Sequence, residues 1–293
     1  MIWRSFMNQA SRLPLSGITV VSLEQAIAAP LASRHLADWG ARVIKIERPG
    51  KGDFCRDYDY VMNGMSSQFA WTNRSKESLA LDVKSSEGKR VFEALLPHAD
   101  VFLQNLAPGA AKRLGLDGAT LVERFPRLIA CDISGYGSGG PYSEKKAYDL
   151  LVQCEAGFLS VNGTDEQPAK CGIAVVDTAT GMYIVNGVLM ALFNRERTGK
   201  GMAFEVSLFD SMAEWMSYPA LLHRGRRRAA TPHRHASRDH RALRAVSVRR
   251  RARDLLRHSE RARMDSALRA SAGRCGAGKR PALLHQSASH GKS

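Results

Sequence analysis

The chain has 293 residues and a formal net charge of +15, and this charge is concentrated at one end. Residues 221–293 hold 18 Arg and 2 Lys against 4 acidic residues, whereas residues 1–220 carry a net charge of −1. The excess charge therefore gives no reason to expect nucleic-acid binding by the first 220 residues. These residues contain enough Val, Ile, Leu and Phe to fill the interior of one large domain.

The first apolar runs predict a strand, a helix and a second strand. A β-branched run at 18–23 is followed by Pro30, a helical stretch to Trp39, Gly40 and a strand-like run at 43–47. Proline near the first turn of a helix and glycine just after its last turn are typical boundaries. These segments therefore predict a βαβ unit.

The same alternation continues along the chain. Strands are expected at 101–103 and 128–133. Ser85 or Ser86 is placed to cap a helix before the first of these strands, with an apolar face made of Val91, Phe92, Leu95 and Leu96. Strands that alternate with helices argue for a parallel sheet with helices on both faces. We therefore expect an α/β fold of Rossmann type.

A βαβ unit with an acid, Glu47, at the end of its second strand suggests a dinucleotide site. However, the turn after the first strand, residues 24–30, lacks the G-x-G-x-x-G pattern that lets a pyrophosphate approach the backbone. This excludes NAD or FAD as the cofactor. The glycines at 135–140 could cradle a phosphate, but without the Lys-Ser/Thr ending of a P-loop a plain turn is the preferred interpretation.

The cysteine pattern and the apolar runs indicate a cytoplasmic protein. No CxxC or zinc-type spacing occurs, which predicts reduced thiols, no disulfide framework and no metal site, among the five cysteines Cys55, Cys131, Cys154, Cys171 and Cys275. Residues 1–17 lack the apolar run of a signal peptide and resemble a transit peptide only weakly. The longest nearly apolar run, 182–193, is too short to span a bilayer.

One carboxylate, Asp177, lies between a strand-like run at 172–176 and an apolar helical run at 178–193. An Asp at such a junction is most often a helix N-cap. The alternative is a chemical centre, held ionised by the helix dipole and the first-turn N–H groups, and this role needs support from elsewhere in the chain. Both roles make the same demand on the local sequence, so spacing alone does not separate them.

Six motifs follow one another between residues 14 and 221: Leu15–Val21, Gly40–Gly50, Asn105–Gly109, Gly135–Pro141, Ala147–Leu151 and Gly172–Asp177. This series resembles the class III CoA-transferases, the CaiB/BaiF family that includes formyl-CoA:oxalate and carnitine CoA-transferases. The resemblance implies the large domain of that fold and transfer of CoA from an acyl-CoA thioester to a free carboxylic acid. It also implies that Asp177 is the nucleophile, which forms an aspartyl anhydride and then an aspartyl-CoA thioester. Overall similarity favours a small dicarboxylate as the acid.

For CoA, which is a substrate and not a bound cofactor, the resemblance points to Arg48, Leu81, Asn105, Arg113, Lys146 and Tyr148. Basic side chains suit the 3′-phosphate and pyrophosphate of CoA. As alternatives, Arg48 and Arg113 are ordinary surface charges, and Asn105 is a turn residue that makes an Asx bond. The resemblance also places Gln25 and Ile27 near the acyl group, although both are adequate as plain loop and helix-entry residues.

The α-methylacyl-CoA racemases resemble this family and also bind CoA thioesters, but they use a His and an Asp as an acid/base pair. Their His would fall at the position of Tyr148. A tyrosine, with an ordinary pKa of about 10, is a poor proton acceptor at neutral pH. A transferase is therefore favoured over a racemase-like enzyme.

The resemblance ends near residue 222. The Arg- and His-rich tail that follows, 222–293, has no aromatic residue and no apolar period. Our leading hypothesis is a frameshift near residue 222; the alternatives are a disordered extension and a tail that binds nucleic acid non-specifically. Residues 1–13 are expected to be a disordered leader. Since the family has a second, smaller domain and interlocked ring-shaped subunits, we expect impaired activity and no interlocked homodimer from this chain.

Overall fold

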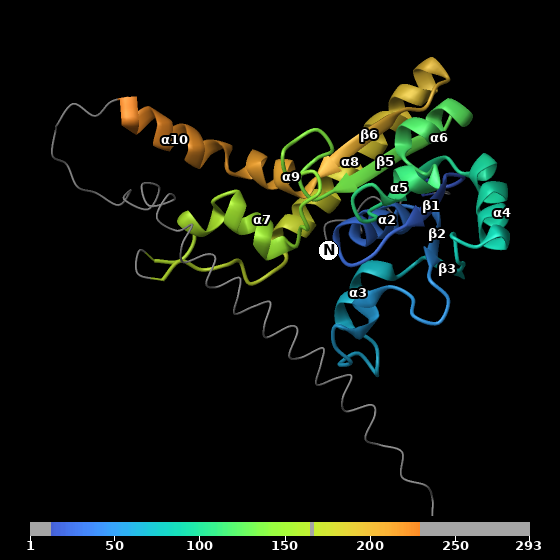
Figure 1. Ribbon diagram of the computed structural model, residues 1–293, viewed down its shortest axis with the longest axis horizontal. Coiled ribbons are helices and arrows are strands. Elements are labelled where there is room, and N and C mark those ends of the chain that lie inside the picture. The colour runs from blue at the N-terminus through green and yellow to red at the C-terminus, as the bar shows by residue number, and fades with distance from the viewer. Residues whose placement is uncertain (1–12, 165–166, 229–293) are drawn as a thin grey trace, which may run out of the picture. The chain divides into compact units, whose positions relative to one another are not determined.

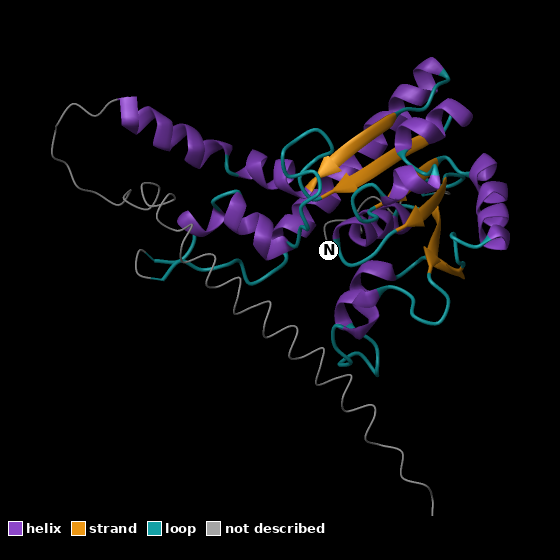
Figure 2. Cartoon of the chain, viewed as in Figure 1, coloured by secondary structure: helices purple, strands orange, loops and turns teal. Residues whose placement is uncertain are grey.

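The computed structural model describes residues 13–164 and 167–228, and a parallel β-sheet runs through this part of the chain (Figure 1 and Figure 2). All neighbouring strands are parallel. The strand order is β3-β2-β1-β4-β5-β6, which is the Rossmann order. The strands are β1 (Thr19–Leu23), β2 (Arg42–Glu47), β3 (Glu77–Ala80), β4 (Val101–Gln104), β5 (Ile129–Ser134) and β6 (Ala203–Ser207).

Helices connect successive strands, as a parallel sheet requires. The α-helices of the described residues are α2 (Ala28–Asp38), α3 (Ser67–Asn73), α4 (Ser86–Leu95), α5 (Ala110–Leu114), α6 (Gly118–Arg124), α7 (Asp149–Glu155), α8 (Val175–Thr198), α9 (Leu208–Trp215) and α10 (Ser217–Arg228). Short 3₁₀ turns are η1 (Phe54–Asp57), η2 (Leu96–His98) and η3 (Phe158–Ser160).

The sheet has an apolar core on each face, because successive residues of a strand point to opposite sides. In β1, Val20 faces a cluster built from α2 and α8, and Val21 faces a second cluster that contains Phe92 and Leu121. α2 and α8 pack closely, and Gly181 permits this: a Cβ there would lie 3.0 Å from the carbonyl oxygen of Ala28. The predicted α/β fold with helices on both faces is confirmed.

The predicted helix after Ser85 is also confirmed, with one error. The Ser85 hydroxyl accepts the N–H of Gly88 at 3.0 Å, so Ser85 is the N-cap of α4. Phe92 and Leu96 are buried, but Val91 is exposed. Adjacent residues of a helix differ by about 100° in direction, so Val91 points away from the face that Phe92 presents to the sheet.

The expectation of a strand at 172–176 is wrong. Val175 and Val176 form the first turn of α8, which continues to Thr198 and ends at Gly199 in the left-handed conformation. Both valines lie in a small core with Val152 and Met212. Tertiary packing, and not the β propensity of valine, decides their conformation.

The remaining expectations concern the basic tail, the leader and the longest apolar run. α10 continues past residue 221 to Arg228, and the rest of the basic tail, residues 229–293, lies outside the described residues, as does most of the predicted leader. Among the described helices, α8 has the length and apolarity of a membrane span. However, its Ile184 and Val188 are fully buried against the sheet, as in the core helix of a globular fold.

Candidate functional site

Polar residues gather at the carboxyl ends of β1 and β4, where the strand order reverses. This is the position at which open α/β sheets bind ligands. The two loops meet through Asn105 and Gln25: the Gln25 N–H donates to Oδ1 of Asn105 at 2.9 Å, and Nδ2 of Asn105 donates to the Gln25 carbonyl at 2.8 Å. The Arg48 guanidinium lies 3.5 Å from Oε1 of Gln25. Three of the residues singled out from the sequence are thus brought together, with the Asn105 amide bound to the Gln25 backbone.

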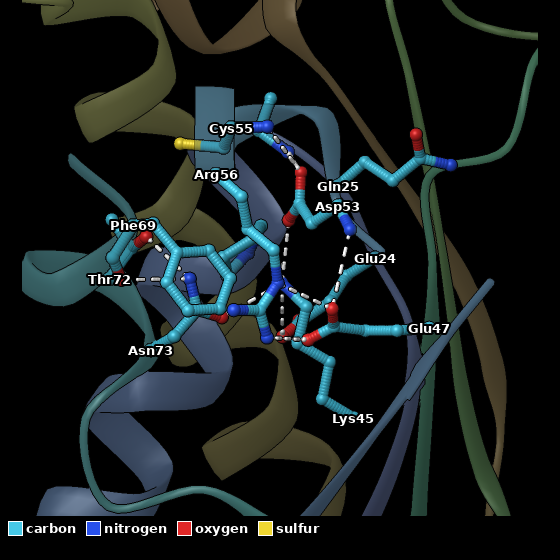
Figure 3. Close-up of polar contacts among 12 residues, drawn as sticks. Glu24, Gln25, Lys45, Glu47, Asp53, Cys55, Arg56, Phe69, Thr72 and Asn73 are labelled. Carbon is cyan, nitrogen blue, oxygen red and sulfur yellow. Dashed lines mark hydrogen bonds and ion pairs between the residues drawn. The ribbon is translucent and has the colours of Figure 1, made fainter. Parts of the chain in front are cut away.

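A buried cluster of charges lies beside Gln25 (Figure 3). Lys76 Nζ is 2.7 Å from Glu24 Oε1, and Lys45 Nζ is 2.6 Å from Asp53 Oδ2 and 3.9 Å from Glu24. Burial by itself would raise the pKa of Glu24, but the charges of Lys76 and Lys45 outweigh this and hold it below its ordinary value. Burial lowers the pKa of Lys76 to about 8. The four side chains carry two charges of each sign, so they compensate one another inside the protein.

The same cluster fixes the backbone of the loop after β1. Ala26 has φ of +65°, a left-handed conformation that costs an alanine roughly 1–2 kcal/mol. Its N–H donates to Oδ1 of Asp53 at 3.1 Å, and Asp53 is held by Lys45 and by the Cys55 N–H. The buried charges therefore hold the loop that presents Gln25.

Glu47, the residue that suggested a ribose-binding acid, forms an ion pair with another residue of the chain. Its two carboxylate oxygens accept from Nε and Nη2 of Arg56 at 2.8 and 2.9 Å. The Arg56 guanidinium in turn stacks on Phe69, 3.8 Å from the ring centre. This arrangement is consistent with the exclusion of a dinucleotide from sequence.

Asp177 lies half-buried in the first turn of α8, as its third residue. The N–H groups of Val176 and Asp177 donate to Oδ1 of Asp149, at 2.7 and 3.2 Å. Asp149 is the first residue of α7 and directly follows Tyr148. Asp177 is therefore not the N-cap, and these first-turn N–H groups are engaged by a second aspartate.

The remaining residues predicted to contact CoA lie on several elements. Lys146 and Tyr148 are exposed in the segment that leads into α7. Arg113 is exposed on α5. Its guanidinium lies over Gly109, so close that a Cβ at Gly109 would come within 2.7 Å of one of its nitrogens. Leu81 is half-buried; its N–H donates to the Glu47 carbonyl at 2.9 Å and its side chain packs against the core. Ile27 is buried, which suits a helix-entry residue.

The glycine-rich turn at 135–140 and the end of β5 bind a carboxylate of the protein itself. Glu205 accepts from the hydroxyl of Ser134 at 2.6 Å and from the hydroxyl and N–H of Ser138 at 2.7 and 3.2 Å. Because these donors are engaged by Glu205, the structure favours the plain turn over a phosphate cradle.

The cysteines of the described ranges are free thiols. Burial raises the pKa of Cys55 to about 12 and that of Cys154 to about 11, so both stay protonated at neutral pH. A protonated thiol is a poor nucleophile. A carboxylate is thus a more suitable nucleophile than either cysteine.

Asp149 and Lys76 were not singled out from the sequence. α8 begins after Ala174, which has no capping side chain, so an acceptor for its first-turn N–H groups had to come from elsewhere. The sequence shows that a capping side chain is missing only once the start of α8 is known, so Asp149 could not be found from local patterns.

A Rossmann-type sheet, with polar loops at the switch point and an aspartate at the start of a buried helix, defines an α/β protein with a candidate ligand site at its carboxyl edge. The chain belongs to CoA-transferase family III, whose family model matches residues 15–254. The resemblance seen in the sequence is confirmed, and the match extends beyond residue 221.

Relatives of known activity are similar over the same region. The succinyl-CoA:glutarate CoA-transferase of Mus musculus is 34% identical over 212 residues, which cover 72% of this chain and 49% of the relative. The succinate–glutarate CoA-transferase of Agrobacterium fabrum is 38% identical, covering 67% of this chain and 51% of the relative. The chain thus spans about half the length of the curated relatives it matches.

Solved structures give the same result. A CAIB/BAIF family protein from Brucella suis superposes with a TM-score of 0.70 at 35% identity, covering 76% of this chain and 60% of that one. A protein from Mycobacterium tuberculosis superposes with a TM-score of 0.67 at 33% identity, covering 72% of this chain and 59% of that one.

Proposed function

We propose that this chain transfers CoA from an acyl-CoA thioester to a free carboxylic acid, with Asp177 as the nucleophile and with impaired activity. The observation that carries the proposal is the place of Asp177 in the first turn of α8, in a chain of CoA-transferase family III. The peptide dipoles of a long helix concentrate positive potential at this end, which favours the ionised carboxylate that the reaction needs.

The proposed reaction conserves the thioester energy through two covalent intermediates. Asp177 attacks the thioester carbonyl, the C–S bond breaks, and CoA thiolate leaves behind a mixed anhydride. The thiolate then attacks the Asp177 carbonyl and releases the donor acid, which gives an aspartyl-CoA thioester. The acceptor carboxylate repeats these steps in reverse, forming the new acyl-CoA and freeing Asp177.

For the CoA site, we assign the phosphates to Arg48, Arg113 and Lys146, which are all exposed cations. Leu81, Asn105 and Tyr148 complete the proposed contacts. The relatives named for glutarate support a small dicarboxylate as the acid. The free cysteines of the described ranges support a reducing, cytoplasmic location.

The first half-reaction provides the test. The full chain is incubated with succinyl-CoA and quenched with hydroxylamine, which converts an activated aspartate to a stable hydroxamate. Peptide mass spectrometry should locate the hydroxamate on Asp177, and Asp177→Asn should abolish it. Glu87→Gln is the matched control, because Glu87 is also a first-turn carboxylate, on α4. Labelling at another residue, or labelling that survives Asp177→Asn, would contradict the proposal.

The exchange of acids tests the second half. With glutarate added, glutaryl-CoA should form at the expense of succinyl-CoA, and chromatography measures both. Epimerisation of an α-methylacyl-CoA without any exchange of acids would instead support the racemase-like alternative.

A further inference from the structure

The helix that carries Asp177 begins without a cap of its own. A helix of 24 residues starts with N–H groups that find no acceptor within the helix. The residue at the N-cap is Ala174, which has no side-chain acceptor, although this position usually provides one. Some other part of the chain has to bind these N–H groups.

Asp149 takes over this function from a different helix. Its Oδ1 accepts the N–H of Val176 at 2.7 Å and that of Asp177 at 3.2 Å, the two N–H groups that an N-cap side chain normally binds. One of the two bonds ends on the backbone of Asp177 itself. The position of the Asp149 carboxylate therefore determines where the backbone of Asp177 lies.

The Asp149 carboxylate is itself held in place. Its Oδ2 accepts from Nε2 of Gln153 at 2.5 Å, one turn further along α7. Oε1 of the buried Gln153 accepts the N–H of Cys171 at 2.9 Å, in the segment that enters α8. Asp149 is thus the central member of a chain of hydrogen bonds that joins the start of α7, the segment before α8 and Asp177.

We propose that Asp149 is a positioning residue for the Asp177 nucleophile. It caps α8 from outside the helix and fixes the distance between Asp177 and the start of α7, where Tyr148 and Lys146 are exposed. This inference rests on the proposed function of Asp177. It requires that the acceptor oxygen, more than the negative charge, is what matters, since the bonds go to backbone N–H groups.

Three variants separate this role from a general effect on stability. Asp149→Ala removes the acceptor. Asp149→Asn keeps one oxygen for the two backbone N–H groups, but its amide nitrogen replaces the Oδ2 that accepts from Gln153, so that bond is lost. Asp117→Ala is the matched control, because Asp117 caps α6 in the ordinary way, through the N–H of Thr120 at 3.2 Å. The single-turnover rate of hydroxamate formation on Asp177 is measured in the full chain against succinyl-CoA concentration.

Asp149→Ala should lower the maximal rate by about tenfold or more, because a misplacement of about 1 Å costs about a hundredfold. The half-saturating concentration of succinyl-CoA should change little. Asp149→Asn, which keeps the acceptor for α8 and loses only the bond to Gln153, should react faster than Asp149→Ala, and Asp117→Ala should react at the parent rate. An Asp149→Ala variant that reacts at the parent rate would overturn the proposal, as would an Asp149→Asn variant as slow as Asp149→Ala.

Amide hydrogen exchange gives a readout that does not need the reaction. The N–H groups of Val176 and Asp177 should exchange faster in Asp149→Ala than in the parent chain, and at nearly the parent rate in Asp149→Asn. Unchanged protection in Asp149→Ala would overturn the positioning role. If the parent chain is not labelled on Asp177 at all, the proposed function fails, and the exchange data still decide whether Asp149 anchors this turn.

Discussion

Replacing Glu24 by Gln tests how much the buried cluster of charges contributes to the stability of the fold. The Glu24 side chain is fully buried; it accepts from Lys76 at 2.7 Å and from the Ser33 hydroxyl at 2.8 Å. Gln keeps the size and an acceptor oxygen but removes the charge. Lys76 would then lose its ion-pair partner, while Asp53 still pairs with Lys45. Breaking a buried ion pair in this way costs roughly 3–5 kcal/mol of unfolding free energy.

The size of this loss should depend on pH, because Lys76 can release its proton. In the parent chain its pKa is about 8. Without Glu24 it falls further, so the folded variant holds Lys76 neutral while the unfolded chain still binds the proton. The stability of the variant should then rise by about 1.4 kcal/mol per pH unit from pH 7, whereas that of the parent chain rises only above pH 8. The difference in unfolding free energy between the parent chain and Glu24→Gln should therefore narrow between pH 7 and pH 8 and stay constant above pH 8.

Urea denaturation of the full chains, followed by circular dichroism, measures both effects. Glu77→Gln is the control: it also removes one carboxylate of an ion pair, but its partner is Arg42 and both side chains are more than half exposed, at 57% and 61%. Exposed pairs contribute little, so this change should be small. Equal effects of the two substitutions, or a difference that does not vary with pH, would refute the reasoning.

Three further substitutions test the packing and the caps. Gly201→Ala should destabilise the chain by about 1–3 kcal/mol in thermal denaturation, because its Cβ would lie 2.0 Å from the backbone oxygen of Leu128; an unchanged midpoint would contradict this close approach. Ser85→Ala should cost about 1 kcal/mol by loss of the bond to the Gly88 N–H, and Ser85→Thr should restore most of it. Burial raises the pKa of Asp149, so its contribution to stability is present below the ordinary aspartate pKa of about 4 and is lost as pH rises through the folded value. Relative to Asp149→Asn, the parent chain should therefore lose stability over that range in urea titrations; a difference that is constant with pH would contradict this.

Much of the fold follows from local patterns. The apolar runs predicted β1, β2, β4 and β5, and the pair Ser85 and Ser86 predicted the start of α4, because capping and alternation depend on neighbouring residues. Local patterns failed at Val175 and Val176, which have strand propensity but pack as the first turn of α8. Contacts with Val152 and Met212, distant in sequence, decide that conformation.

For the candidate site, too, local patterns predicted some features and long-range contacts decided others. The order of the motifs and the chemistry of single residues were enough to predict the family, the α/β class and Asp177 as the residue to test, because both can be read without knowing any tertiary contact. The partners of the polar residues came from tertiary contacts: Asp149 binds the backbone of Asp177, Asn105 binds that of Gln25, and Glu24 is paired with Lys76. Each of these contacts joins residues at least 28 positions apart. No local pattern contains such pairings, because they form only when folding brings distant elements together. Gln25 and Asn105 follow the carboxyl ends of the neighbouring parallel strands β1 and β4, whereas Asp149 and Asp177 lie at the starts of α7 and α8.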